Sequence, residues 1–337
     1  MADPIKLEPK AKSTPAEKLW ALAADEMEAV DSLIRDRMQS PVGLIPNLAE
    51  HLVGAGGKRL RPLLTVASAA LCDYKGTDHH KLAAAVEFIH SATLLHDDVV
   101  DDSELRRGRK PANLIWGNAS SILVGDFLFA RAFNLMVETG SLEALGILSK
   151  ASSVIAEGEV KQLAALRQID ISEADYMDVI RAKTAALFAA ATEVSPVISG
   201  RPMTERTALR DYGLKLGLAF QLVDDVLDYG GLESALGKSV GDDFREGKVT
   251  LPVIRAWQQA DQEEKAFWHR VVVDKDQTAP DLETAISYLR KAGTLESTLD
   301  QARRYADEAE QALSIFPDSP WRSTMKALAG YVVERVS

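Results

Sequence analysis

The chain has 337 residues, of which 46% are hydrophobic and 26% charged, and its formal net charge is −11. This composition indicates a globular protein with a sizeable core, not a disordered chain, and the negative charge argues against nucleic acid as a partner. The single cysteine, Cys72, excludes a disulfide framework and thiolate-held zinc or iron–sulfur sites.

The sequence shows no evident targeting or membrane segment. Residues 1–13 are polar and lack the apolar core of a secretory signal. The longest run without a charged residue, 111–125, contains two asparagines and two serines. No segment therefore resembles a membrane span, and we expect a cytoplasmic protein.

A helical period runs through the chain. Thr14, Pro15 and Glu17 form a capping box with proline at the first helical position, which predicts a helix from there to about Met38. Further helices are expected at about 61–72, 79–103, 113–138, 142–167, 172–199, 204–229, 249–260, 263–273, 279–292, 294–314 and 319–335. Glycine, proline, serine and aspartate fill the connections, and no strand pair is evident.

Several of these segments are apolar over most of their circumference. The run from Thr184 to Thr192 is one, and such a helix belongs inside a bundle. No low-complexity linker and no repeat of fixed period divide the chain. We therefore predict an all-α fold with one domain over residues 1–337, in which 1–40 are an N-terminal extension and first helix.

Two acidic motifs with the spacing D-D-x-x-D lie inside apolar helical segments. They comprise Asp97, Asp98 and Asp101, and Asp224, Asp225 and Asp228. Positions i and i+4 share a helix face, so the outer carboxylates of each motif repel one another. A solvated acidic face explains one such motif about as well as a ligand site does, but two copies after apolar runs favour a bound cation. An all-oxygen ligand set suits Mg²⁺ or Mn²⁺.

Basic residues cluster near the acidic motifs. Lys58, Arg59 and Arg61 follow a glycine pair, the run 106–110 follows the first motif, and Lys238 and Lys248 follow the second. Each cluster by itself is typical of basic side chains exposed on a protein surface. Their proximity to the aspartates favours a shared phosphate-and-metal site.

Three other motifs can be tested on the sequence. A P-loop needs a leading glycine where Leu52 and Leu232 stand. The E-x-x-H from Glu87 to His90 suits a di-iron bundle, but none of the other five histidines supplies the second copy. The doublet His96-Asp97 resembles a phosphohydrolase motif, which would leave the second D-D-x-x-D unexplained.

A group of motifs occurs in one order along the chain: GGKRLRP, the E-x-x-H helix, DDVVDDSELRRG, Lys183-Thr184, FQLVDDVLD and GKSVGDDFREGKVTLP. With them the chain, from about Leu44 onward, resembles the all-trans polyprenyl diphosphate synthases, most closely the long-chain members that make octaprenyl, solanesyl or decaprenyl diphosphate. One departure is Asp102, where those relatives more often carry glutamate. The resemblance implies the isoprenoid synthase fold, a helical bundle around a deep central cavity, and a homodimer.

The resemblance also implies a reaction. Isopentenyl diphosphate is added 1′–4 and all-trans to an allylic diphosphate (farnesyl or geranylgeranyl diphosphate) to give a C40–C50 product for a quinone side chain. Both aspartate motifs would hold Mg²⁺, with three ions per active site and Mn²⁺ able to substitute. These ions would neutralise the leaving diphosphate. The released diphosphate is the expected base. Contact with a membrane is at most peripheral.

Further site residues are carried over from the resemblance alone. The allylic diphosphate would be held by Arg106, Lys183, Thr184, Gln221, Lys238 and Lys248, with Lys183 also counted as catalytic. Isopentenyl diphosphate would be held by Lys58, Arg61, His90 and Arg107. A lone helical histidine is more often a core residue, but His90 lies on the face of Asp97, two turns away. Thr184 and Gln221 also fit as ordinary buried polar residues.

Alternative functions remain within and outside this class. A terpene cyclase of the same fold usually replaces the second aspartate motif, which is intact here. A shorter-chain synthase (C15–C20) differs in the residues below the first motif. A silent subunit of a heteromeric synthase typically loses aspartates or arginines, and none is lost.

Product length should depend on the residues that precede the first motif. Ala92 and Thr93 stand where short-chain members carry aromatic side chains, so the growing tail can continue past them. Phe133, on the next helix, is the candidate floor of the tunnel, although a core phenylalanine would look the same in the sequence.

Overall fold

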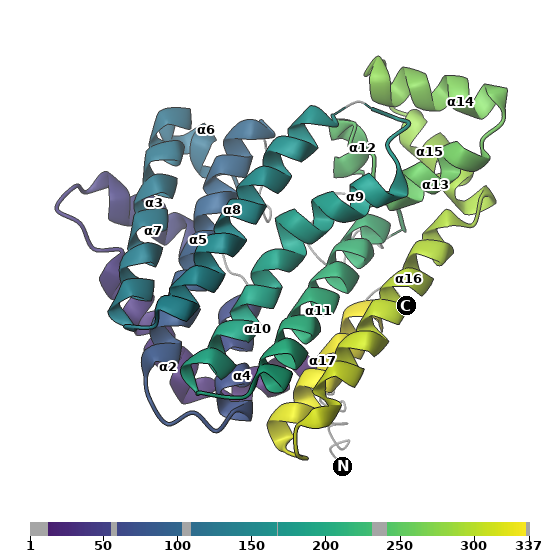
Figure 1. Ribbon diagram of the computed structural model, residues 1–337. Helices are drawn as coiled ribbons and strands as arrows, with labels where there is room; N and C mark the ends of the chain where they lie inside the picture. The colour runs from purple at the N-terminus through teal and green to yellow at the C-terminus, as the bar shows by residue number, and fades with distance from the viewer. Residues whose placement is uncertain (1–12, 55–58, 103–108, 167, 231–240, 335–337) are drawn as a thin grey trace, which may run out of the picture.

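The computed structural model describes residues 13–54, 59–102, 109–166, 168–230 and 241–334. Within these ranges the chain is helical and forms no β-strand (Figure 1). The predicted all-α fold is confirmed.

The helices follow the expected order closely. They are α1 (Pro15–Leu22), α2 (Ala24–Arg37), α3 (Leu44–Gly54), α4 (Leu60–Leu71), α5 (Asp78–Val100), α6 (Ala112–Trp116), α7 (Asn118–Glu138), α8 (Leu142–Ala164), α9 (Glu173–Ile180), the π-helix η1 (Arg181–Ala185), α10 (Ala186–Ile198), α11 (Met203–Gly230), α12 (Asp242–Glu246), α13 (Leu251–Gln259), α14 (Gln262–Trp268), the π-helix η2 (His269–Val273), α15 (Asp281–Lys291), α16 (Thr294–Ala312), the 3-10 turn η3 (Leu313–Ile315) and α17 (Pro320–Glu334).

Some predicted helices are divided. The capping box at Thr14 forms as expected, but the helix that it starts is interrupted at Ala23. The predicted helix 113–138 is two helices because Gly117 adopts φ +82, a conformation that an α-helix cannot contain. The sequence analysis did not anticipate α3 and α12.

The central layer is formed by α10 and α11, with α5, α7 and α8 to one side and α16 and α17 to the other (Figure 1). Phe188 of α10 is 1% exposed, as expected for the apolar run that contains it. Thr192 is buried in the same helix, and its hydroxyl donates to the carbonyl of Leu209 in α11 at 2.6 Å. These contacts fix the spacing of the helices that carry the functional residues.

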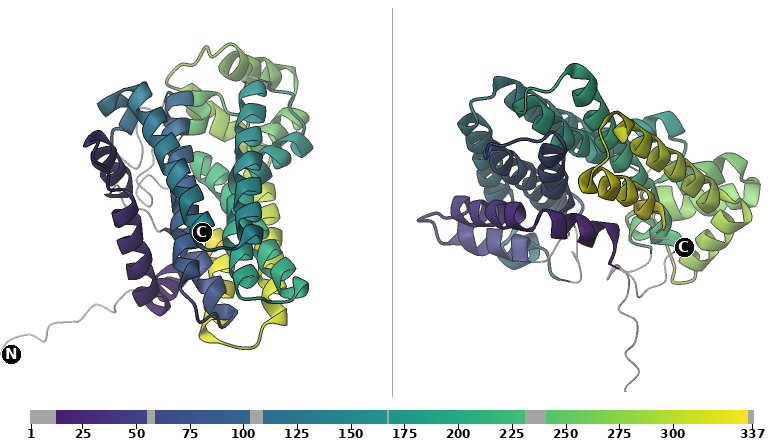
Figure 2. Two further views of the ribbon diagram at one scale, coloured as in Figure 1. Left: turned by 60° about the vertical axis from the view of Figure 1, so that its left-hand side comes forward. Right: turned by 90° about the horizontal axis from the view of Figure 1, so that it is seen from below.

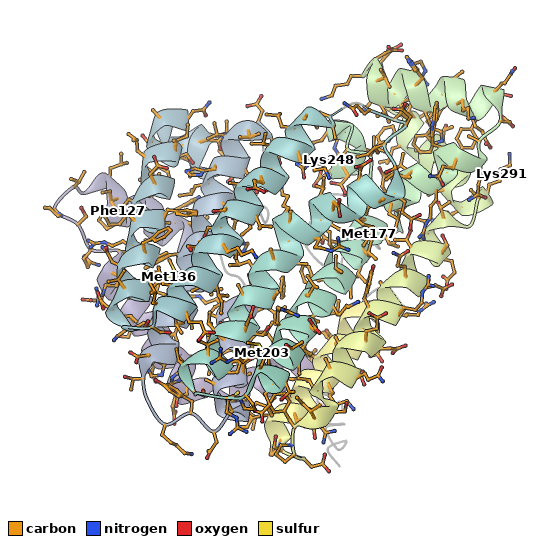
Figure 3. All side chains as sticks on the ribbon, in the orientation of Figure 1. Phe127, Met136, Met177, Met203, Lys248 and Lys291 are labelled. Carbon is orange, nitrogen blue, oxygen red and sulfur yellow. The ribbon has the colours of Figure 1, made fainter. Side chains whose placement is uncertain are left out.

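A second, smaller core lies at the end of the bundle where α11 finishes. Trp268, Val271 and Leu289 are buried there with Tyr229 and Phe244, from α11 and α12. The labelled Lys248 lies near this end and Met203, at the start of α11, lies at the opposite end (Figure 3). On α11, Val223 and Val226 belong to the main core and Tyr229 to the smaller one, so the second aspartate motif lies where the two cores adjoin.

The first two helices cover one side of the bundle (Figure 2). Leu19, Met27, Val30 and Ile34 are wholly buried, and α2 packs on α4 and α5. Of the described helices, α7 has the length and apolar character to cross a membrane, with 39% of its apolar window buried. Core helices of globular proteins meet the same criterion, so this finding is weak evidence for a span.

The contact between α10 and α11 gives a test of the packing. A side chain at Gly213 would overlap the carbonyl oxygen of Phe188 and the hydroxyl of Thr192. Gly213→Ala should therefore lower the free energy of unfolding by roughly 1–3 kcal/mol, because a close-packed contact cannot move aside without strain. Denaturant unfolding followed by circular dichroism measures the change.

Gly146→Ala is the matched control, since a side chain there meets no atom within 4 Å on α8. It should raise stability by about 0.5–1 kcal/mol through helix propensity. Equal effects of the two substitutions would show that α10 and α11 are not in close contact.

Candidate active site

The two acidic motifs meet at one cavity of about 300 Å³. Asp97 and Asp101 line it from the end of α5, and Asp224 and Asp225 line it from the last turns of α11. The carbonyl end of a helix carries partial negative charge, so both helices add to the negative potential there. The arrangement favours cations strongly.

The second motif is the more buried of the two. Asp225 is 2% exposed and accepts hydrogen bonds from the hydroxyl of Tyr176 and from Gln221 Nε2, the latter at 3.0 Å. Burial, with the nearby charge of Asp243, raises the pKa of both Asp225 and Asp228. Without added positive charge, these carboxylates are destabilised in their ionised form. The all-oxygen donor set therefore fits a hard divalent cation.

Two lysines supply positive charge at the cavity. Lys183 Nζ lies 2.8 Å from Glu159 Oε2 and 3.6 Å from Asp97 Oδ2. Lys248 Nζ lies 3.4 Å from Asp101 Oδ2 and pairs with Glu246. Burial alone lowers the pKa of Lys248, but the surrounding carboxylates raise it well above its ordinary value. Both cations connect the first motif to other helices.

Lys183 and Thr184 are held on the π-helix η1, between α9 and α10. The wider turn is common at functional sites because it re-aims side chains within a helix. The hydroxyl of Thr184 donates to Gln221 Oε1 at 2.8 Å, and Gln221 donates to Asp225. Thr184 and Gln221 both line the cavity, so a chain of hydrogen bonds runs from η1 to the second motif.

Arg61 and His90 come together although they lie on different helices. Arg61 Nη1 is 3.2 Å from His90 Nε2, and the guanidinium carbon lies 4.4 Å from the centre of the Phe188 ring. Neither residue belongs to the lining of the acidic cavity as the described residues form it. Arg59, which had no predicted role, pairs with Asp31 of α2.

Several predicted residues lie elsewhere or outside the described residues. Asp98 is 1% exposed, and its carbonyl oxygen accepts from the amide of Asn113 at 3.0 Å. Asp228 accepts from the backbone N–H groups of Asp242 and Asp243. Four predicted phosphate-binding residues lie outside the described ranges: Lys58, Arg106, Arg107 and Lys238.

The three residues predicted to control product length lie on the paired helices α5 and α7. Ala92 is wholly buried. Thr93 is half-buried, and its hydroxyl donates to the carbonyl of His90 at 2.8 Å. Phe133 is half-buried, with its ring centre 6.0 Å from that of Phe129. These positions leave their predicted role untested.

The sequence analysis missed three residues of the cavity region. Glu159 anchors Lys183, and burial raises the pKa of its carboxyl. Tyr176 and Asp243 line the cavity beside Asp225. Glu159 and Tyr176 give a weak signal, because a single glutamate or tyrosine on a helix has the pattern of an ordinary surface or core residue. Asp243 lies in the motif GKSVGDDFREGKVTLP, but the sequence analysis assigned it no role.

Residues 42–289 match the polyprenyl synthetase family. The chain belongs to this family. It is 45% identical to the octaprenyl diphosphate synthase of Escherichia coli K12, over 95% of this chain and 98% of that protein. It is 40% identical to the all-trans-nonaprenyl-diphosphate synthase (geranyl-diphosphate specific) of Rhodobacter capsulatus, over 94% and 97% of the two chains.

Solved structures agree with this assignment. The polyprenyl synthase of Caulobacter crescentus CB15, crystallised with calcium and isoprenyl diphosphate, has a TM-score of 0.93 and 55% identity, covering 97% of this chain and all of that one. A decaprenyl diphosphate synthase of Rhodobacter capsulatus has a TM-score of 0.92 at 55% identity, over 96% and 100% of the two chains. The predicted family and activity are confirmed: the enzyme is a prenyltransferase that makes long-chain polyprenyl diphosphates of C40–C50.

The cavity geometry predicts the effect of removing either acidic motif. Asp97→Ala and Asp224→Ala should each lower kcat by at least ~10²–10³-fold, as the loss of other preorganised electrostatic groups does. Steady-state kinetics measures the loss, and circular dichroism checks that the helices are retained. Asp211→Ala, which removes an exposed carboxylate earlier on α11, is the control. Near-normal turnover in both motif variants would rule out the site.

Proposed function

We propose that the cavity binds the allylic diphosphate on divalent ions held between the two aspartate motifs, and that Arg61 and His90 belong to a separate pocket for isopentenyl diphosphate. The observation that carries this proposal is that both motifs face one cavity beside Lys183 and Lys248. The complex of the Caulobacter relative with calcium and isoprenyl diphosphate supports it.

The aspartates are the residues that would hold the ions. We propose Mg²⁺, three ions per active site, with Mn²⁺ as a substitute and ligands drawn from Asp97, Asp98, Asp101, Asp224, Asp225 and Asp228. When bound, the ions supply Lewis-acid neutralisation of the leaving diphosphate. The raised pKa values of Asp225 and Asp228 support the assignment, since both carboxylates gain from added positive charge.

The chain's own residues orient the allylic substrate. Lys183 is held by Glu159 on one side and reaches Asp97 on the other, so its ammonium group lies where a diphosphate joined to the first motif would sit. Lys248 has the same relation to Asp101. Thr184 and Gln221 fix the carboxyl of Asp225. Arg106 and Lys238 would complete this pocket.

The second substrate needs no metal of its own. Arg61 donates from Nη1 to His90 Nε2, and the Phe188 ring faces the guanidinium from one side, so the guanidinium is held in place with further N–H groups to donate. Lys58 and Arg107 would complete the pocket. Carbon 4 of isopentenyl diphosphate then attacks carbon 1 of the allylic cation, and the proton lost from carbon 2 passes to the released diphosphate.

Exposed apolar side chains indicate how the enzyme associates. Leu123 and Val137 on α7 and Leu142, Val160 and Leu163 on α8 are each more than half exposed. Exposed apolar side chains on neighbouring helices are a feature of interfaces, and we propose that this face of α7 and α8 pairs two copies of the chain. A homodimer accounts for the apolar character of α7 without a membrane span. The enzyme is proposed to act in the cytoplasm, with at most peripheral membrane contact and a quinone side chain as the destination of its product.

Product analysis tests the proposed function and the length determinants together. Farnesyl or geranylgeranyl diphosphate with labelled isopentenyl diphosphate and Mg²⁺ should give C40–C50 products on chromatography, and excess EDTA should abolish them. Ala92→Phe should end elongation at about C15–C20, because a ring added to a close-packed interior blocks the tail while leaving the diphosphate contacts intact. Phe133→Ala should lengthen the products.

Wild-type product length from Ala92→Phe would show that the tail does not pass this position. Persistence of full activity in EDTA would overturn the metal assignment itself. The two results separate an error in the tunnel from an error in the site.

The division into two pockets predicts opposite kinetic effects. Arg61→Ala and Lys58→Ala should raise the KM for isopentenyl diphosphate, and Lys183→Ala should raise the KM for the allylic substrate. Loss of a charged contact to phosphate corresponds to ~1.5–3 kcal/mol, or roughly ten- to a hundredfold. Lys291→Ala removes a distant exposed cation and should change neither constant (Figure 3). Equal effects of all three variants on both substrates would contradict the division.

A further inference from the structure

A second cluster of metal-ligating side chains lies away from the aspartates. His79 and His80 stand in the first turn of α5, and Glu26 reaches them from α2. Glu26 Oε2 pairs with the Nε2 atoms of both rings, at 3.0 Å for His79. One ligand atom from each residue can be chosen so that all three lie within 4.8 Å of one another.

The cluster is well separated from the catalytic cavity. His79 precedes Asp97 by eighteen positions on one continuous helix, which corresponds to about 27 Å along the axis. The aspartate motif is at the carboxyl end of α5 and the histidines are at its amino end. An ion at one site therefore shares no ligand with the other.

The chemistry of the three groups selects a different class of ion. Two imidazole nitrogens and one carboxylate oxygen suit Zn²⁺, Co²⁺ or similar ions, whereas Mg²⁺ prefers oxygen ligands only. We propose that Glu26, His79 and His80 form a second metal site, for Zn²⁺, with water in the fourth position. Ligands at 2.0–2.1 Å in a tetrahedron are about 3.3 Å apart, so the separation of His79 and Glu26 requires little change.

Neighbouring side chains hold the rings of His79 and His80 in place, and the side of Glu26 is open to solvent. His79 has a side chain only 7% exposed, and its ring lies edge-on to Tyr74 at 5.5 Å and 4.1 Å from the ring of His80. The Glu26 side chain is 48% exposed, so an ion and its water can enter from that side.

An ion at this site would stabilise the packing of α2 against α5. The cluster joins α2 to α5, and α2 buries Met27 one position after Glu26. An ion that binds the folded chain alone raises its thermal stability in proportion to the logarithm of its concentration. We therefore expect a bound ion to raise thermal stability without changing turnover at the distant aspartates.

The test uses the full chain in saturating Mg²⁺, which occupies the aspartates, with Co²⁺ as a spectroscopic probe and Zn²⁺ for thermal unfolding. Glu26→Gln and His80→Gln each remove one ligand. His269→Gln is the matched control, because His269 is an exposed histidine whose Nδ1 lies 3.2 Å from Asp274. Circular dichroism shows whether each variant is folded. If His80→Gln does not fold, Glu26→Gln alone provides the test.

We expect one Co²⁺ per chain, with the intense visible absorption of a four-coordinate site, in the wild type and in His269→Gln. The affinity for Co²⁺ should fall at least ~10-fold in Glu26→Gln and in His80→Gln. The loss of a group that only supports a metal ligand already costs that much at other metal sites. Zn²⁺ should raise Tm only where Co²⁺ binds, and synthase activity in Mg²⁺ should be retained throughout. Equal Co²⁺ affinity in all four proteins, or no Co²⁺ binding in the presence of Mg²⁺, would overturn the proposal.

Discussion

Carboxylates gathered at the carbonyl ends of two helices are the constraint on which the rest of this structure depends. Asp97 and Asp101 on α5 and Asp224 and Asp225 on α11 share a small cavity, where burial and neighbouring carboxylates raise the pKa of Asp225. Positive charge must therefore be supplied from outside the two motifs. The protein supplies part of it with Lys183 and Lys248, and divalent ions are proposed to supply the remainder.

The helices around this site are held in place although the aspartates that they carry repel one another. Close packing of α10 on α11, with Thr192 bonded across the contact, fixes the helix that bears the second motif. The π-helix η1 interrupts the regular run between α9 and α10 and places Lys183 opposite Asp97. The π-helix η1 and the packing of α10 on α11 thus have the same effect. Both hold charged side chains of the site at a fixed separation.

Much of this could be predicted from the sequence, for identifiable reasons. The two D-D-x-x-D motifs are local patterns whose spacing indicates a cation site, whereas the roles of the basic residues came from the family resemblance. The apolar period located most helices, although it did not show where two of them are divided. The partners of those residues were less accessible. Glu159 meets Lys183 only because α8 packs on η1, and one glutamate on a helix carries no mark of that contact. The π-turn likewise has no sequence pattern, and the short helix α12 is below the length at which periodicity is informative.

The central claim is that the two motifs act as one site, and a double-mutant cycle tests it most directly. Asp97→Asn, Asp224→Asn and the double variant would be compared with the wild type in single-turnover condensation of farnesyl and isopentenyl diphosphates. If both motifs hold the same ions, the double variant should lose little more rate than the worse single variant, because either change alone disables the shared site. Losses that multiply, so that the two changes act independently, would contradict the account.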